Sequence, residues 1–200
     1  EQADTARLET FARQQKVTPN TLVQAAWLIV LQRYCAQATV CFGATVSGRP
    51  AELSGVEQQL GLFINTLPVV SVGQWLQQVQ AQNLGLREHE HTPLFEIQRL
   101  AGKNAESLFD TLLVFENYPI SQALEQTPST TLHFGSIRTH EQTNYPLTLM
   151  VGFGAMLTLQ ASYDQAHFDT ATVEKLAHSL LRLLRAMLDS PDQAIGDLVM

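Results

Sequence analysis

The stretch G-L-F-I-N-T-L-P at Gly61–Pro68, together with S-G-R-P at Ser47–Pro50, decides the fold of this chain. Each motif adjoins a strand pattern. The residues of Thr39–Val46 are β-branched and aromatic enough for a strand that ends at S-G-R-P, and Ile64–Val72 suggests a second strand within and beyond the other motif. The glycines and prolines between them predict an excursion of the chain that separates the two strands.

The first motif follows the end of its predicted strand, which places polar groups at the rim of a sheet. Gly48 lets the backbone turn sharply or approach a ligand. Arg49 offers five donors in a planar fork for a carboxylate, a phosphate or main-chain carbonyls. Taken alone, Ser47–Pro50 is typical of a turn with a salt-bridging arginine.

The second motif contains one amide in apolar surroundings, Asn65, which is flanked by Phe63, Ile64 and Leu67. Buried polar groups need hydrogen-bond partners. Two interpretations follow: Asn65 fastens the backbone of a neighbouring loop, or it presents its amide to a ligand in a channel. We favour the structural interpretation.

Upstream of these motifs the sequence predicts two helices. The first is short and is indicated by the spacing of Leu8, Phe11 and Ala12. The second begins near Asn20, after Thr18 as N-cap and a proline at the first helical position. Its window Leu22–Cys35 is apolar on nearly every face, so we expect neighbours to cover it on more than one side.

Downstream, helical and strand patterns alternate. We predict a helix from Gln74 that includes Trp75, Leu76, Val79 and Leu86, and a short helix at Leu94–Leu100 after Pro93. A central strand is predicted at Leu108–Phe115, ending at Asn117-Tyr118-Pro119. A strand at Leu147–Val151, an alternating strand at Leu157–Asp164 and a final helix near Thr170–Leu188 follow. Gly152 and Gly154 predict the hairpin turn between the last two strands.

Composition limits the function further. The formal charge of −7 and the lack of a basic cluster argue against nucleic acid or an anionic membrane as partner. The most apolar window is shorter than the ~20 residues that span a bilayer. We interpret Cys35 and Cys41 as reduced thiols, and this interpretation favours a cytoplasmic location. The chain starts at Glu1 without a targeting signal, and we expect it to be a piece of a longer polypeptide.

The sequence lacks the local motifs that identify several common catalytic and nucleotide-binding sites. The sequence has no G-x-S-x-G, no G-x-x-x-x-G-K-[ST] and no H-E-x-x-H. Glu88-His89-Glu90-His91 is the one place where a metal could be suspected, but imidazoles at i and i+2 do not share a helix face. We interpret this cluster as a solvated helix end and predict no metal site. His133, His140, His167 and His178 are isolated and are interpreted as structural or exposed.

Several ordered segments resemble the carboxy-terminal half of a condensation domain from a nonribosomal peptide synthetase. Besides the two motifs above, these are E-H-T-P-L-F-E-I-Q-R at Glu90–Arg99, L-F-D-T-L-L-V-F-E-N-Y-P at Leu108–Pro119 and T-N-Y-P-L at Thr143–Leu147. Together they span most of the chain. The element Phe63-Ile64-Asn65-Thr66 is like that of ordinary condensation domains, whereas epimerisation domains of the superfamily carry a G-W-F-T-type element.

The resemblance implies an α/β fold, a chloramphenicol acetyltransferase-like lobe with a mixed β-sheet packed with helices. Residues 1–190 would form this carboxy-terminal lobe, and residues 191–200 would begin a linker to the next domain. The region Ser47–Pro68 would contain a crossover toward a first lobe. The implied residues of the substrate channel and crossover are Ser47, Gly48, Arg49 and Asn65, with Ser47 bonding substrate or pantetheine and Arg49 holding the crossover.

The implied reaction is amide formation between a donor acyl or peptidyl thioester and an acceptor aminoacyl group, both on carrier proteins. The family's catalytic H-H-x-x-x-D-G motif belongs to the preceding half, and none of the six histidines here is followed four residues later by Asp-Gly. We therefore assign no catalytic residue to this chain and expect it to be inactive alone.

The implied partners are the amino-terminal lobe, peptidyl or acyl carrier proteins and an adjacent adenylation domain. We expect no cofactor bound directly, because phosphopantetheine would arrive on the carriers. The alternative is a non-catalytic docking lobe for carrier or adenylation domains. Without its sister lobe the chain would expose an apolar patch, which makes self-association an expected property.

Overall fold

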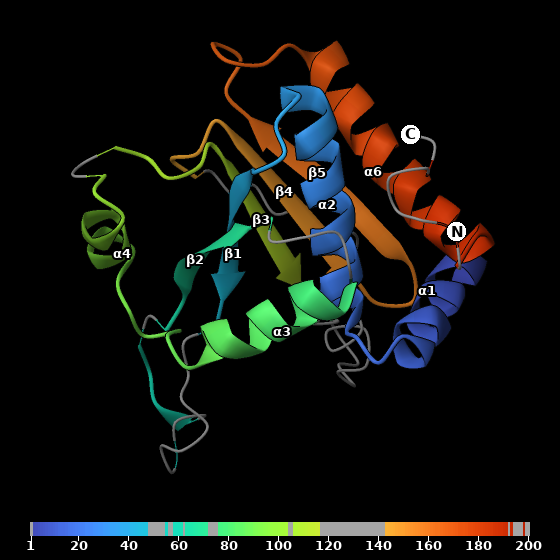
Figure 1. The fold of residues 1–200 in the computed structure, drawn as a ribbon, viewed down its shortest axis with the longest axis horizontal. Coiled ribbons are helices and arrows are strands. Elements are labelled where there is room, and N and C mark those ends of the chain that lie inside the picture. Colours follow the sequence, from blue (N-terminus) through green and yellow to red (C-terminus); the bar gives the residue numbers. More distant parts are fainter. Residues whose placement is uncertain are drawn as a thin grey trace, which may run out of the picture.

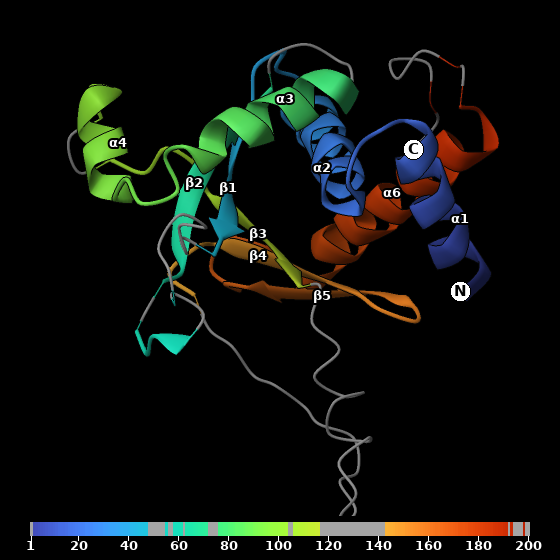
Figure 2. The same cartoon turned by 90° about the horizontal axis from the view of Figure 1, so that it is seen from below.

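The structure, a computed structural model, describes residues 2–47, 55, 58–61, 63–71, 76–103, 106–116, 143–191, 193 and 198. These residues form a mixed α/β lobe in which a five-stranded sheet has the order β2-β1-β3-β4-β5. Figure 2 shows α1, α2, α3 and α6 together on one side of this sheet. The predicted architecture, a mixed sheet packed with helices, is confirmed.

The three middle strands of the sheet are parallel and the two edge strands are antiparallel to them. β1 (Cys41–Val46) pairs with β3 (Thr111–Glu116), and β3 pairs with β4 (Leu147–Phe153), in parallel. β2 (Asn65–Val70) and β5 (Leu157–Tyr163) close the two sides. The carboxyl ends of β1, β3 and β4 therefore meet at one edge of the sheet, and their amino ends meet at the opposite edge.

Proline is accommodated in this sheet because of its position. Pro68 lies in β2, opposite Gly43 of β1. Proline has no N–H to donate, and it is tolerated on an edge strand whose outer side needs no partner. The strand predicted at 64–72 is present over Asn65–Val70 and lies at the edge of the sheet, and residue 72 is outside the described residues.

The helix α2 (Pro19–Cys35) is the centre of the helical layer. Thr18 caps it by accepting a hydrogen bond from the backbone N–H of Thr21 at 3.2 Å, as predicted. Every residue of Thr21–Leu31 is buried, because the sheet lies beneath the helix and α3 (Leu76–Arg87) and α6 (Thr170–Asp189) contact it. The expected cover on more than one side is confirmed, and Figure 1 shows α2 crossing the sheet.

The last helix, α6, covers the β5 side of the sheet with a single apolar stripe. Asp169 caps its start by accepting from the Thr172 N–H at 2.8 Å, and this bond holds the pKa of the carboxyl below its usual range. Its buried residues recur at helical spacing: Val173, Leu176, Leu180, Leu183, Leu184 and Met187. α1 (Gln2–Gln14) packs against α6 and presents the predicted Leu8, Phe11 and Ala12 to the core.

The predicted turn at Gly152 differs from the structure, and two other predicted positions fall outside the described residues. Gly152 belongs to β4 and pairs with Thr158, so the turn to β5 occupies residues 154–156 and does not begin at Gly152. A Cβ at Gly152 would lie 2.5 Å from Thr158 Oγ1, so glycine there makes room for a cross-strand hydroxyl. Trp75 and the 117–119 strand end lie outside the described residues.

The face of the sheet opposite the helices carries an aromatic pair. The rings of Phe109 and Tyr145 stack with their centroids 5.3 Å apart. The Phe109 ring lies over Gly43, where an added Cβ would come within 2.3 Å of Phe109 Cε2 and 2.9 Å of Thr66 Cγ2. Gly43 therefore lets the ring pack directly on the β1 backbone.

We expect Gly43→Ala to lower the free energy of unfolding by about 1–3 kcal/mol, because the added methyl group overpacks a buried site. The matched control is Gly85→Ala in α3, where nothing lies within 4 Å of the new Cβ. Alanine in a helix interior is favoured over glycine by about 0.5–1 kcal/mol, so this control raises the stability. Urea titration followed by circular dichroism measures both. Equal effects of the two variants would contradict the packing argument.

Candidate functional site

The carboxyl end of β1 and the start of β2 bring the two diagnostic motifs together. Val46, the last residue of β1, pairs with Asn65, the first residue of β2. Ser47 follows directly and its side chain is exposed. The structure thus places Ser47 and Asn65 at the same edge of the sheet. Gly48 and Arg49 lie outside the described residues.

Asn65 directs both amide hydrogens and one lone pair of its oxygen to the protein's own backbone. Its Nδ2 donates to the carbonyl oxygens of Glu90 and Thr92, both at 2.8 Å, and its Oδ1 accepts from the Thr66 N–H at 2.9 Å. Both amide hydrogens are therefore occupied. These contacts confirm the structural interpretation, in which Asn65 fastens the backbone of a neighbouring loop. The oxygen keeps one lone pair, so an acceptor role toward a ligand stays open.

The loop held by Asn65 is the turn 88–92 that follows α3. It is also closed by its own backbone, because His89 N–H donates to Leu86 O at 2.9 Å and Thr92 N–H donates to His89 O at 2.9 Å. The side chains of His89 and His91 are exposed, as expected for a solvated helix end. Across the described ranges, no group of three or more His, Cys, Asp or Glu side chains is arranged to hold a metal ion.

Exposed apolar side chains precede the edge strand β2 and lie on α4, which contacts it. α4 (Leu94–Leu100) begins after Pro93 and has no buried residue, although it contacts β2. Phe95 and Leu100 are 66% and 75% exposed, and Ile64, directly before β2, is 64% exposed. Figures 1 and 2 show α4 standing beyond β2, away from the main helical layer. We call Ile64, Phe95 and Leu100 the apolar rim. The sequence predicts α4 but gives no signal that it stays uncovered.

A second contact joins two further segments of the sequence. Phe109 lies just before β3 and Tyr145 just before β4, and their stacked rings connect the L-F-D and T-N-Y-P-L segments. Thr143 and Thr148 share a hydrogen bond between their hydroxyls, and the Tyr145 N–H donates to Thr143 Oγ1 at 3.3 Å. Burial raises the pKa of the Tyr145 phenol, which keeps it protonated at neutral pH. This stack was not predicted from sequence.

The described histidines are not arranged as catalytic groups. His167 Nδ1 lies 2.8 Å from Asp164 Oδ2, and both side chains are exposed. The Ala166 N–H and His167 together hold the pKa of Asp164 below its usual range. His178 Nδ1 donates to the Glu174 carbonyl oxygen at 2.7 Å, one turn earlier in α6. His133 and His140 lie outside the described residues. The described residues of the site can therefore position a bound group and form hydrogen bonds with it.

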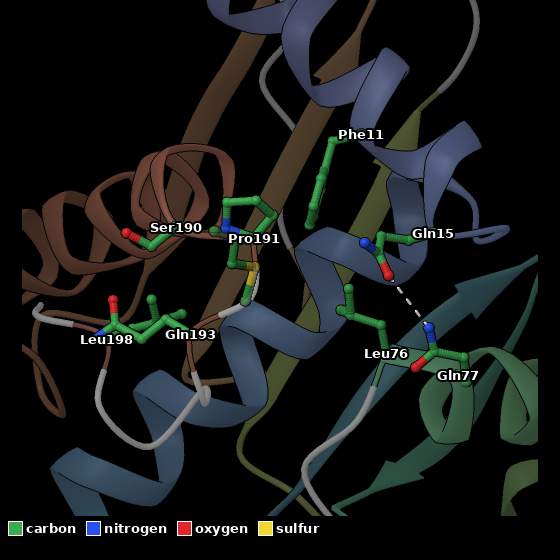
Figure 3. Close-up of a pocket in the computed structure, with 9 residues that line it drawn as sticks. Phe11, Gln15, Leu76, Gln77, Ser190, Pro191, Gln193 and Leu198 are labelled. Carbon is green, nitrogen blue, oxygen red and sulfur yellow. Dashed lines mark hydrogen bonds between the residues drawn. The ribbon is translucent and has the colours of Figure 1, made fainter.

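A small hollow of about 160 Å³ lies where α1, α3 and α6 meet the last described residues (Figure 3). Phe11, Leu76 and Pro191 line it, and Gln77 Nε2 donates to Gln15 Oε1 across it at 3.4 Å. Leu198, which also lines it, is 4% exposed. Its carbonyl oxygen accepts from Arg33 Nη1 at 2.7 Å. At least one residue of the predicted linker segment thus packs against the lobe; the boundary at residue 190 stays a prediction.

The family profile and the related sequences that match this chain indicate the same protein family. The profile of the family described as Condensation domain matches residues 1–200. The chain is 42% identical over 205 residues to one of the proteins that make up the linear gramicidin synthase of Brevibacillus parabrevis. It is 32% identical over 203 residues to surfactin synthase subunit 3 of Bacillus subtilis (strain 168). Each alignment covers 98% of this chain but only 3% and 16% of the two relatives' lengths.

Solved structures show the same fold. One is holo-AB3403, a four-domain nonribosomal peptide synthetase bound to AMP and glycine, with a TM-score of 0.85 and 19% identity over 99% of this chain and 17% of that one. Another is the condensation domain from the Monacolin K polyketide synthase MokA, with a TM-score of 0.78 and 16% identity over 96% of this chain and 46% of that one. The expected acetyltransferase-like fold is confirmed.

Among the residues that the structure describes, no helix is both long enough and apolar enough to cross a membrane.

We expect Asn65→Asp to destabilise the chain at pH 7 by about 1–3 kcal/mol, because a carboxylate would face two carbonyl oxygens in place of an N–H donor. The charged form is disfavoured in the folded state, so the folded pKa of the new carboxyl lies above the ~3.9 of a free aspartate. The loss of stability is therefore present at pH 7 and declines as the pH falls through that folded pKa. Thermal unfolding at pH 7 and pH 4 measures it.

The control for this substitution is Asn83→Asp, because Asn83 Nδ2 makes only a long 3.4 Å bond to the Thr21 hydroxyl. A carboxylate there gives up one long bond and does not face two carbonyl oxygens at 2.8 Å, so we expect a smaller loss than for Asn65→Asp. If Asn65→Asp unfolds at the same temperature as the unmodified chain at pH 7, Asn65 does not fasten the 88–92 turn.

Proposed function

The chain belongs to the condensation-domain family, and we propose that it is one lobe of a condensation domain that forms an amide bond between a donor acyl or peptidyl thioester and an acceptor aminoacyl group. One observation carries this proposal: the family profile matches the chain from residue 1 to 200, yet the chain covers only 46% of a solved condensation-domain chain. A lobe of this size needs a second lobe to complete a cleft. We infer that this second lobe is the amino-terminal half.

The apolar rim supports a partner on this side of the lobe. Large apolar side chains that gather on a surface mark interaction sites more often than isolated ones do. Ile64 directly precedes the edge strand β2, whose first residue pairs with Val46 before Ser47, and α4, which carries Phe95 and Leu100, contacts β2. We propose that the amino-terminal lobe covers this rim, and that the cleft between the lobes begins at Ser47.

The proposed reaction requires little covalent chemistry from this lobe. The acceptor amine attacks the donor thioester carbonyl, a C–N bond forms, the C–S bond breaks, and the pantetheine thiol leaves with the proton that the amine loses. Holding the two reactants in register and stabilising the tetrahedral oxyanion lower the barrier. By family resemblance, Ser47 bonds substrate or pantetheine, Arg49 holds the crossover, and Asn65 keeps this wall of the channel in shape.

The proton must be handled by a group outside this chain. No histidine here stands in an H-H-x-x-x-D-G context. We propose that this motif lies on the amino-terminal lobe, and that carrier proteins deliver both substrates on phosphopantetheine. An adjacent adenylation domain would supply the activated amino acid. A cytoplasmic location remains a prediction from the reduced-thiol interpretation of Cys35 and Cys41.

We expect the 200-residue chain alone to form no dipeptidyl product from a donor-loaded and an acceptor-loaded carrier protein, because a positioned acid or base that contributes roughly 10²–10⁴-fold is on the other lobe. The same assay with the complete condensation domain, followed by mass spectrometry of the acceptor carrier, is expected to give product. Product from the chain alone would refute the division of labour, and lack of product from the complete domain would refute the amide-forming function.

A docking role is the second candidate, and the apolar rim is the observation that favours it. The two roles differ in what the rim contacts: the sister lobe in the first, a carrier or adenylation domain in the second. Both predict that the isolated chain associates through the rim.

We expect the isolated chain to self-associate at tens of micromolar concentration, and the double substitution Phe95→Gln with Leu100→Gln to shift it toward the monomer. Sedimentation velocity or light scattering measures the change. The control is Met156→Gln in the β4–β5 turn, because Met156 is 55% exposed and β5 lies at the sheet edge opposite β2. A chain that stays monomeric at every concentration, or a control that acts as strongly as the double variant, would contradict the assignment.

A further inference from the structure

The last described residue of the chain, Leu198, is buried in the main core although it lies beyond the last helix. α6 ends at Asp189, whereas Leu198 is 4% exposed and belongs to the same hydrophobic core as the buried residues of α1, α2 and α6. Residues at the ends of domains are usually poorly ordered unless something ties them down. The burial of Leu198 therefore calls for specific contacts that hold it.

Leu198 lies where α1, α3 and α6 meet (Figure 3). It lines the hollow of about 160 Å³ together with Phe11 of α1, Leu76 of α3 and Met187 of α6. Removing a leucine side chain from water is favourable, so these apolar surroundings oppose the detachment of Leu198 from the lobe.

The main chain of Leu198 is held by a charged donor. Arg33, in the last turn of α2, donates from Nη1 to the Leu198 carbonyl oxygen at 2.7 Å, and this bond is partly buried. Hydrogen bonds from an ionised donor are shorter and stronger than neutral ones. The burial of Leu198 and the bond to its carbonyl oxygen involve different helices, and together they fix the position of this residue.

The chain turns directly after α6. The Ser190 N–H donates to the Ala186 carbonyl oxygen at 2.9 Å, and the Gln193 N–H donates to the Ser190 carbonyl oxygen at 3.1 Å. A backbone bond between residues i and i+3 closes a tight turn. Pro191 lines the same hollow as Leu198. The chain is therefore next to the lobe at Pro191 and again at Leu198.

We propose that Arg33 and the burial of Leu198 anchor the end of this chain on the helical layer, so that the domain that follows the lobe lies over α1 and α6 and away from the apolar rim. The second half of this inference rests on the proposed function, in which an adenylation domain is adjacent. A chain that is free after Ser190 gains roughly 28 Å of reach over the eight residues to Leu198, and the anchor removes that freedom.

The anchor and the apolar rim belong to opposite sides of the lobe. α6 contacts α1 and the edge strand β5, whereas α4 contacts β2, the strand at the other edge of the sheet. Figures 1 and 2 both show α1 and α6 at one side and α4 at the other. A domain that lies over the anchor therefore leaves the rim to the sister lobe.

¹⁵N relaxation of the 200-residue chain tests the anchor without any assumption about function. We expect the backbone N–H of Leu198 to have an order parameter of about 0.85, whereas a free tail has values below about 0.6. Arg33→Met removes the donor and keeps an unbranched apolar stem, and we expect it to lower the Leu198 value below about 0.6. The matched control is Arg13→Met on the exposed side of α1, where Arg13 pairs with Glu9, and it is expected to leave Leu198 unchanged.

The three lysines of the chain report where the following domain lies. Lys16 follows α1, Lys175 lies in α6, and Lys103 follows α4. In the polypeptide that contains the complete condensation domain and its adenylation domain, we expect an amine-reactive cross-linker to join adenylation-domain lysines to Lys16 and Lys175 several-fold more often than to Lys103. Mass spectrometry of the digested protein measures this ratio. A one-ended reagent corrects for differences in reactivity, since the Glu106 side chain raises the pKa of Lys103.

Each part of the inference has its own contradicting result. An order parameter below about 0.6 for Leu198 in the unmodified chain overturns the anchor, and an unchanged value in Arg33→Met overturns the role of Arg33. Cross-links mainly to Lys103 overturn the placement of the following domain and favour the docking role of the apolar rim. The product assay on the complete domain tests amide formation separately, so the failure of one is distinguishable from the failure of the other. Because the unmodified chain carries the first test, a variant that fails to fold does not protect the proposal.

Discussion

The all-round apolar surface of α2 is the constraint on which the rest of the lobe depends. A helix that buries eleven consecutive residues, Thr21–Leu31, has no face left for solvent. It must have the sheet beneath it and helices beside it, and α3 and α6 supply those flanks. This requirement places the helical layer on one side of the sheet (Figure 2). The carboxyl edge, with Ser47 and β2, is thereby left outside the main core.

Two contacts join motifs that lie far apart in the sequence. Asn65 joins the strand β2 to the turn 88–92 through two bonds from one amide. The Phe109–Tyr145 stack joins the segments that lead into β3 and β4, and Gly43 gives the Phe109 ring its place. The motif residues seen in the structure thus hold loops and strand ends in fixed positions. The proposed function, in which this lobe is one wall that aligns two tethered substrates, requires such fixed positions.

The carboxyl edge of the sheet leaves large apolar side chains exposed on both sides of β2 in the sequence. Ile64 directly precedes this strand, and α4, which contacts it, carries Phe95 and Leu100 and buries none of its residues. The Asn65 amide already has hydrogen bonds within the lobe, so exposed apolar area is what this edge offers to the partner in the proposed function.

The sequence by itself determined the family, the positions of most helices and strands, and which of their faces are buried. Apolar periodicity predicted α6, because one buried stripe at helical spacing is a local pattern. The long apolar window of α2 has no such stripe, and Thr18 and Pro19 marked its start through local capping. Sequence also suggested that Asn65 bonds a loop, since a polar group beside apolar neighbours needs partners. Tertiary structure alone decided that this loop is 88–92, that Gly152 continues β4, that Phe109 stacks on Tyr145, and that α4 stays uncovered. Each of these depends on which distant segments approach each other, and side-chain type along the chain does not encode that proximity.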